Sequence, residues 1–100
     1  MPSTKTEDMV LEKPKTKFPP QYKVIILNDD LSPFEFVIWI LMKIFKKDIK
    51  TAEKISLDTH NNGSALVGMY RKEIAEAKIN KAMDYANQGG FPLTFTTEKE

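Results

Sequence analysis

The 100-residue sequence contains no cysteine, which excludes disulfide cross-links, thiolate metal ligands and a thiol nucleophile. An excess of charge of one sign is also missing, since fifteen Lys and Arg residues stand against fourteen Asp and Glu residues. A nearly neutral chain argues against nucleic acid or an anionic membrane as the main partner. The longest apolar run is far too short to span a bilayer, and the N-terminus lacks the apolar region of a signal peptide. We therefore expect a soluble, cytoplasmic protein.

Residues that could perform catalysis or bind phosphate are scarce. His60 is the only histidine. Of the candidate nucleophiles, Ser32 is sufficiently explained as a helix cap, and no strained-elbow or oxyanion Gly pattern surrounds Ser56. There is no Gly-rich phosphate-binding loop, and the adjacent acids Asp29 and Asp30 lack the spacing of zinc ligands. These absences predict a protein without enzymatic activity, metal or cofactor.

The composition divides the chain near residue 20. Residues 1–20 carry four prolines, mixed charge and no sustained periodicity. Such a segment cannot bury enough apolar surface to offset its ordering entropy. We therefore predict a flexible N-terminal arm over residues 1–20 and one domain over residues 21–100, which is long enough to form a single core.

The apolar patterns of the domain predict six elements. In order they are a strand at 22–27, helices at 33–46 and 49–60, a strand at 64–70, a helix at 72–87 and a strand at 92–97. The unbroken apolar run of the first strand indicates burial on both faces or a central place in the sheet. Pro92 lacks a backbone N–H, so the last strand must either lie at an edge of the sheet or begin at Pro92. The economical arrangement is an α+β fold of order β-α-α-β-α-β, with a three-stranded antiparallel sheet packed against three helices.

Particular residues mark the predicted helix ends. Ser32 is expected to cap the first helix, with Glu35 three residues later completing a capping box. Asp48 is expected to cap the second helix, and Gly63 to end it in a left-handed conformation. The third helix, with apolar residues at 75, 79, 82 and 86, is amphipathic and ends at the glycines 89–90.

Three polar residues at 28–30, Asn-Asp-Asp, separate the first strand from the first helix. Composition alone favours a polar turn in which the Asp side chains bond local backbone amides. The alternative is a binding site. Asn, Asp and neutral imidazole are hydrogen-bond acceptors, and such a cluster without a basic neighbour suits a free α-amino group, which offers three donors and one positive charge. Ser56, Thr59 and His60 share one face of the second helix. An amine site beside this face would recognise both the α-amine and the side chain of the first residue of a peptide.

These residues carry a resemblance to a known family. The run "YKVIILNDDLSPFEFV", the "TH" at the end of the second helix, "VGMYRKEIAEAK" and "PLTFTTEKE" resemble the ClpS family of protease adaptors from about Tyr22 to the C-terminus. The resemblance implies a non-enzymatic adaptor of the bacterial N-end rule that binds N-degrons, proteins beginning with Leu, Phe, Tyr or Trp. It further implies delivery to the N-terminal domain of a ClpA-type AAA+ unfoldase partnered with the ClpP peptidase, a step for which the family needs its N-terminal arm.

The resemblance also implies roles for individual residues. The residues matching the family's α-amine site are Asn28, Asp29 and His60, bordered by Asp30 and Ser32. Those matching its hydrophobic pocket are Phe34, Val37, Ser56, Thr59 and Leu93. Those matching its unfoldase interface are Glu73 and Lys78, which by themselves would be interpreted as part of a solvated charged helix face. Family members commonly have Met in place of Phe34 and Ser56, and Val in place of Thr59.

A second function class remains open. Related folds occur in the C-terminal domain of the ribosomal stalk protein, so the fold alone does not decide function. A stalk-like or scaffold module would bind a protein through a helix face and hold no peptide. Trp39 and Met42 share the outer face of the first helix with charged residues, and they are either ordinary scattered surface apolar residues or a docking place.

Overall fold

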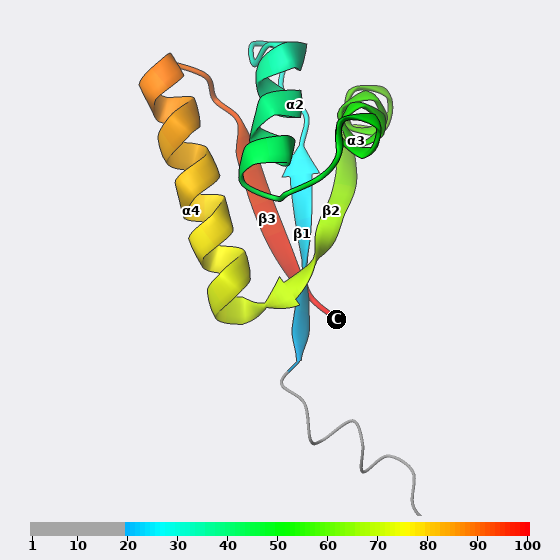
Figure 1. Cartoon of the computed structure of the whole chain (residues 1–100), viewed down its shortest axis with the longest axis vertical. Helices are drawn as coiled ribbons and strands as arrows, with labels where there is room; N and C mark the ends of the chain where they lie inside the picture. The colour runs from blue at the N-terminus through cyan, green and yellow to red at the C-terminus, as the bar shows by residue number, and fades with distance from the viewer. Residues whose placement is uncertain (1–19) are drawn as a thin grey trace, which may run out of the picture.

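The computed structural model describes residues 20–100, so all but the last residue of the predicted arm, residues 1–20, lies outside the described residues. The elements are β1 (Gln21–Leu27), α2 (Phe34–Lys43), α3 (Ile49–Asn62), β2 (Ser64–Arg71), α4 (Lys72–Gly89) and β3 (Thr94–Lys99). Their order confirms the predicted β-α-α-β-α-β, α+β fold (Figure 1). In this part of the chain no helix is both long and apolar enough to cross a membrane.

The sheet is antiparallel, with the strand order β2-β1-β3. The predicted central place of the first strand is therefore confirmed, and the last strand lies at an edge, although it begins at Thr94 rather than at Pro92. All three helices lie over the same face of the sheet (Figure 1). Val24 and Ile26 of β1 are fully buried, whereas Ile25 between them is only partly buried, because alternate residues of a strand point to opposite faces.

The core lies between this face and the helices. Its largest fully buried side chains are Val24, Ile26, Ile40 and Leu41, so α2 packs its apolar face onto the central strand. The helix α4 contributes only small side chains to the fully buried layer, namely Ala75, Ala82 and Ala86. Their spacing places them on one face of the helix, where small residues let the α4 backbone approach the core closely.

The predicted cap of the first helix is wrong. Pro33, with an extended backbone at φ −64° and ψ 145°, occupies the N-cap position of α2, and no side chain caps this helix. The helix also ends at Lys43, three residues before the predicted end, and Lys46 has a left-handed φ of 58° that cannot continue it. Ser32 lies one residue before the N-cap position, and its backbone amide and its hydroxyl both donate to Asp29 instead.

The predicted ends of the second helix are confirmed. The Asp48 side chain accepts a hydrogen bond from the backbone amide of Thr51 at 3.2 Å. Hydrogen bonding to the Thr51 side chain and to this amide holds the pKa of Asp48 below its usual value. Gly63 follows α3 with φ 90°, the left-handed region, and its carbonyl accepts from the amide of Asn28 at 2.9 Å. The left-handed turn at Gly63 thus joins the end of α3 to the polar segment that follows β1.

Replacing Gly63 by Ala should lower the free energy of unfolding by about 1–2 kcal/mol, the cost of placing an L-residue in the left-handed region. A methyl group would meet no atom within 4 Å, so the loss would come from backbone strain and not from a clash. Urea denaturation measures this loss in the free energy of unfolding. Asn tolerates the left-handed conformation, so Gly63→Asn is the control and should lose less; equal stability of Gly63→Ala and the wild type would contradict the prediction.

Candidate functional site

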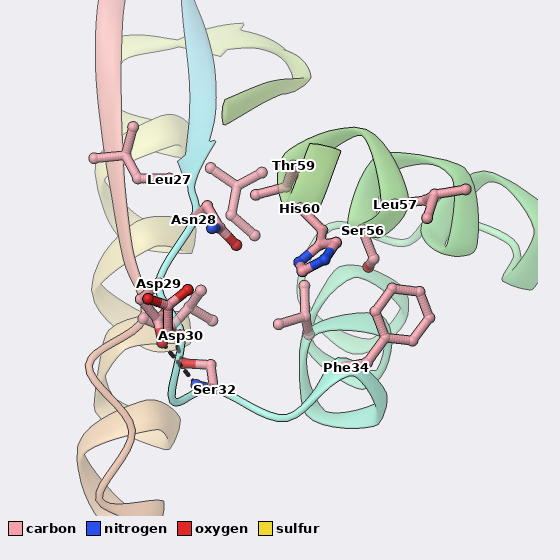
Figure 2. Close-up of a pocket in the computed structure, with 13 residues that line it drawn as sticks. Leu27, Asn28, Asp29, Asp30, Ser32, Phe34, Ser56, Leu57, Thr59 and His60 are labelled. Carbon is pink, nitrogen blue, oxygen red and sulfur yellow. Dashed lines mark hydrogen bonds between the residues drawn. The ribbon is translucent and has the colours of Figure 1, made fainter. Parts of the chain in front are cut away.

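A cavity of about 450 Å³ opens where β1 ends and where α2 begins. Its walls come from the end of β1, the β1–α2 segment, α2, α3 and the residue before β3 (Figure 2). Ten of the lining residues were named from the sequence: Asn28, Asp29, Asp30, Ser32, Phe34, Val37, Ser56, Thr59, His60 and Leu93. The structure therefore brings the predicted amine-site and pocket residues together around one space, although they lie in four segments of the chain.

Three further lining residues were not named from the sequence: Ile26, Leu27 and Leu57. Ile26 and Leu27 end β1 and directly precede the polar segment, so their position next to Asn28 was the available signal. Leu57 follows Ser56 on α3 and is half-exposed. Nothing in the helical periodicity of α3 distinguishes Leu57 from an ordinary exposed apolar residue.

The rim of the cavity carries polar side chains, and its buried wall combines apolar side chains with two hydroxyl groups. Asn28, Asp30 and His60 are exposed at the rim. Figure 2 shows the three polar residues after β1 on one side of the space and His60, Ser56 and Phe34 on the other. The buried lining residues are Ile26, Ser56, Thr59 and Leu93. The site can therefore hold a group that is polar at one end and bulky and apolar at the other.

Asp29 organises the segment between β1 and α2. Its Oδ1 accepts from the backbone amides of Leu31 at 2.8 Å and Ser32 at 2.6 Å, and its Oδ2 accepts from the Ser32 hydroxyl at 2.8 Å. The polar-turn interpretation is thus correct for this residue. It does not exclude binding, because an ionised carboxylate offers about four acceptor sites and three are used here.

The electrostatic character of the cavity is acidic. Asp29 and Asp30 both line it, and none of the described lining residues is Lys or Arg. Two carboxylates beside amide and imidazole acceptors favour a cation that carries several N–H donors. An anionic group such as a phosphate would meet like charge and find no basic side chain in the cavity wall.

The two hydroxyl groups on the α3 wall differ in their partners. Thr59 Oγ1 donates to the backbone carbonyl of Ile55, one turn earlier, at 2.7 Å. The hydroxyl of Thr59, which the Val common at this position in the family would lack, is therefore satisfied within the helix. Ser56 Oγ is buried and has no hydrogen-bond partner among the described residues. Phe34, with 46% of its surface exposed, lies near Leu57 at the outer part of the cavity (Figure 2).

Glu73 and Lys78 lie away from this cavity, in a groove between the end of α2 and the start of α4. Lys78 is partly buried. Its Nζ donates to the backbone carbonyl of Ile44 at 2.9 Å and lies 5.6 Å from the centre of the Tyr70 ring, whose burial raises the Tyr70 pKa. Lys78 is therefore more than a solvated charge, since it satisfies a carbonyl after the end of α2, whereas Glu73 is exposed.

The outer face of α2 is partly packed by aromatic residues. Trp39 contacts Tyr85 of α4 edge-to-face at 5.1 Å between ring centres, and it stacks on Phe36 at 6.1 Å. The ammonium group of Lys43 lies 5.6 Å from the Trp39 ring. Trp39 thus joins α2 to α4 even though 42% of its surface is exposed.

Comparisons with known proteins identify the family of this chain. The family model described as "ATP-dependent Clp protease adaptor protein ClpS" matches residues 17–96. The chain belongs to the ClpS family. It is 47% identical to ClpS 2 of Bradyrhizobium diazoefficiens over 88 residues, which cover 88% of this chain and 80% of that relative. It is 45% identical over 100 residues to ClpS of Campylobacter jejuni strain RM1221, with both chains covered in full.

The fold also matches a solved ClpS structure. Agrobacterium tumefaciens ClpS2, bound to L-phenylalaninamide, superimposes with a TM-score of 0.80 and 42% sequence identity, covering 83% of this chain and 100% of that one. The resemblance to ClpS that the sequence motifs indicated is therefore confirmed, and so is the fold class. The family is one of protease adaptors, which places this chain in association with a Clp protease.

The hydrogen bonds of Asp29 predict a stability difference between the two adjacent acids. Asp29→Ala removes three hydrogen bonds to a charged acceptor and should lower the free energy of unfolding by about 1–3 kcal/mol. Asp30→Ala is the matched control, because Asp30 is exposed and its replacement should change stability by less than about 0.5 kcal/mol. Thermal denaturation of both variants tests the difference, and equal losses would show that Asp29 does not hold the turn.

Proposed function

We propose that this ClpS-family chain is a non-enzymatic adaptor that binds N-degron substrates in the cytoplasm. It would hold their free α-amine and their bulky hydrophobic first residue (Leu, Phe, Tyr or Trp), and deliver them to a ClpA-type AAA+ unfoldase of the ClpAP protease. One observation carries this proposal: the rim of the cavity offers acceptors without a basic neighbour, and the buried apolar side chains of Ile26 and Leu93 line the same space. The two ends of such a space match the two ends of an N-terminal residue.

The amine would bind at the rim. Asn28 and His60 lie on opposite sides of the space and each provides an acceptor, provided that the imidazole is neutral (Figure 2). The carboxylate of Asp29 provides the counter-charge through its remaining acceptor site, and Asp30 and Ser32 border the same place. Charge-assisted hydrogen bonds of this kind are about twice as strong as neutral ones, so an ammonium group should be strongly preferred over an amide.

The first side chain would enter the apolar part of the cavity. Val37 and Leu93 line this part, together with Phe34 near its opening and the satisfied Thr59. A cavity of about 450 Å³ lies within the range of about 300–1,000 Å³ found for small-ligand sites. L-phenylalaninamide, the ligand of Agrobacterium tumefaciens ClpS2, has a free α-amine and a phenyl side chain, which supports the same use of the cavity here.

Delivery to the unfoldase requires a second surface, and the groove at Glu73 and Lys78 supports one. The cavity is lined by Phe34 and Val37 in the first half of α2, whereas the groove is lined by Lys43, its last residue, and by residues that follow it. Val37 of the cavity and Lys43 of the groove are six residues apart on α2, or about 9 Å along the helix axis, so a peptide and a partner protein could be bound at the same time. An adaptor needs this separation, because it must hold the substrate while it binds the unfoldase.

The decisive test of binding compares one short peptide beginning with Phe with the same peptide acetylated at its N-terminus. The free amine should bind much more tightly, because acetylation removes the charge and leaves acceptors unpaired. Asn28→Ala and His60→Ala should each weaken binding of the free peptide by about 1–3 kcal/mol in fluorescence anisotropy. Equal affinity for both peptides, or binding of neither, would reject the proposal and favour a stalk-like or scaffold module.

Delivery should be separable from binding. Glu73→Lys reverses one charge in the groove and should weaken docking of the unfoldase N-terminal domain, while peptide affinity stays unchanged. Deleting residues 1–17 should likewise leave peptide affinity intact, because every cavity residue lies in the described domain. Both variants should slow degradation of an N-degron reporter by ClpAP. Normal degradation with both would exclude these roles for the groove and the arm.

A further inference from the structure

Ser56 carries the one buried side-chain oxygen that lacks a hydrogen-bond partner within residues 20–100. Only 3% of the residue is exposed, and it lies on α3 in the wall of the cavity. The large majority of buried polar atoms in proteins have a partner, so an exception calls for a physical explanation. A hydroxyl in the wall of a binding cavity is explained if its partner arrives with the ligand.

The helix could have satisfied this hydroxyl and does not. A Ser or Thr within a helix can donate to the carbonyl four residues earlier. Thr59, one turn along on the same wall, makes this bond to Ile55. Ser56 makes no such bond, and Figure 2 shows its side chain on the cavity side of α3, between His60 and Phe34. Two hydroxyl groups on one helical wall thus differ: that of Thr59 is satisfied within the helix, and that of Ser56 is buried without a partner among the described residues.

The position of Ser56 sets which ligand atom can reach it. Ser56 and His60 are four residues apart, so they lie on one face of α3, separated by about 6 Å along the helix axis. His60 is exposed at the rim and Ser56 is buried. A first residue whose amine is held at His60 would therefore extend its side chain along α3 toward Ser56. The distance is comparable to the reach of an aromatic side chain, whose far end would meet the hydroxyl.

From this arrangement we infer that Ser56 is a specificity-determining residue that hydrogen-bonds a polar atom at the far end of an aromatic first residue. The inference rests on the proposed function of the cavity. The phenolic hydroxyl of Tyr is the ligand group that fits best, because it can donate to or accept from a serine hydroxyl. Phe has the same ring and leaves the serine unpaired. The site therefore selects Tyr over Phe, although its other buried lining residues favour both rings equally.

The test measures affinities of two short peptides that differ only in a first residue of Tyr or Phe. For the wild type, the Tyr peptide should bind about three- to tenfold more tightly than the Phe peptide, the effect of one net hydrogen bond. Ser56→Ala removes the hydroxyl and little volume, so it should bring the ratio close to one while leaving affinity for Phe equal or better. Thr59→Val is the matched control. It removes the hydroxyl that Ile55 already satisfies and should leave the wild-type ratio unchanged.

The outcomes separate this inference from the function on which it rests. One outcome is that Phe peptides bind with a strong preference for the free amine while Ser56→Ala keeps the wild-type ratio of Tyr to Phe affinity. In that case the proposed function stands, and Ser56 does not select between Tyr and Phe. If Thr59→Val lowers the ratio as much as Ser56→Ala does, selection does not depend on the unpartnered hydroxyl, and the inference is wrong. If free and acetylated peptides bind alike, both proposals fail. Circular dichroism on each variant confirms that the fold is retained.

Discussion

The cavity depends on how the chain is held between β1 and α2, and the carboxylate of Asp29 holds it. Three hydrogen bonds from Leu31 and Ser32 converge on this one side chain, and the amide of Asn28 is bonded to Gly63 at the end of α3. The segment is thus fixed at the turn and against a neighbouring helix. Without these bonds the acceptors at the rim would have no defined position relative to His60, and a recognition site needs such preorganisation.

The fold explains how one small domain can present two separate surfaces. The helix α2 contributes the fully buried Ile40 and Leu41 to the same core cluster as the central strand. One end borders the acidic cavity, and the other borders the groove that contains Glu73. Lys78 strengthens the second end by bonding a carbonyl that follows the helix. The core of the domain thus lies between two surfaces, the proposed peptide site and the proposed unfoldase site.

Much of this architecture depends on local features that the sequence displays. The order of the elements follows from apolar periodicity, and the ends of α3 follow from Asp48 and Gly63, whose effects act within a few residues. The N-cap of α2 was predicted wrongly for a physical reason. Ser32 is a residue type that often caps helices, but the helix begins one residue later than a Ser32 cap requires, and Ser32 donates to Asp29 within the turn. Where the helix begins depends on the path of the chain from the sheet.

The sequence by itself determined the family, the fold class and the residue types of the candidate site, because the motif around residues 28–37 is contiguous and specific. Only the tertiary structure decided that residues from four segments enclose one cavity, since that depends on packing between elements distant in the chain. It also decided the roles of two hydroxyl groups that look equivalent in the sequence. Thr59 finds a carbonyl within its own helix, and Ser56 is buried without a partner, because hydrogen bonding is set by side-chain direction and surroundings rather than by residue type.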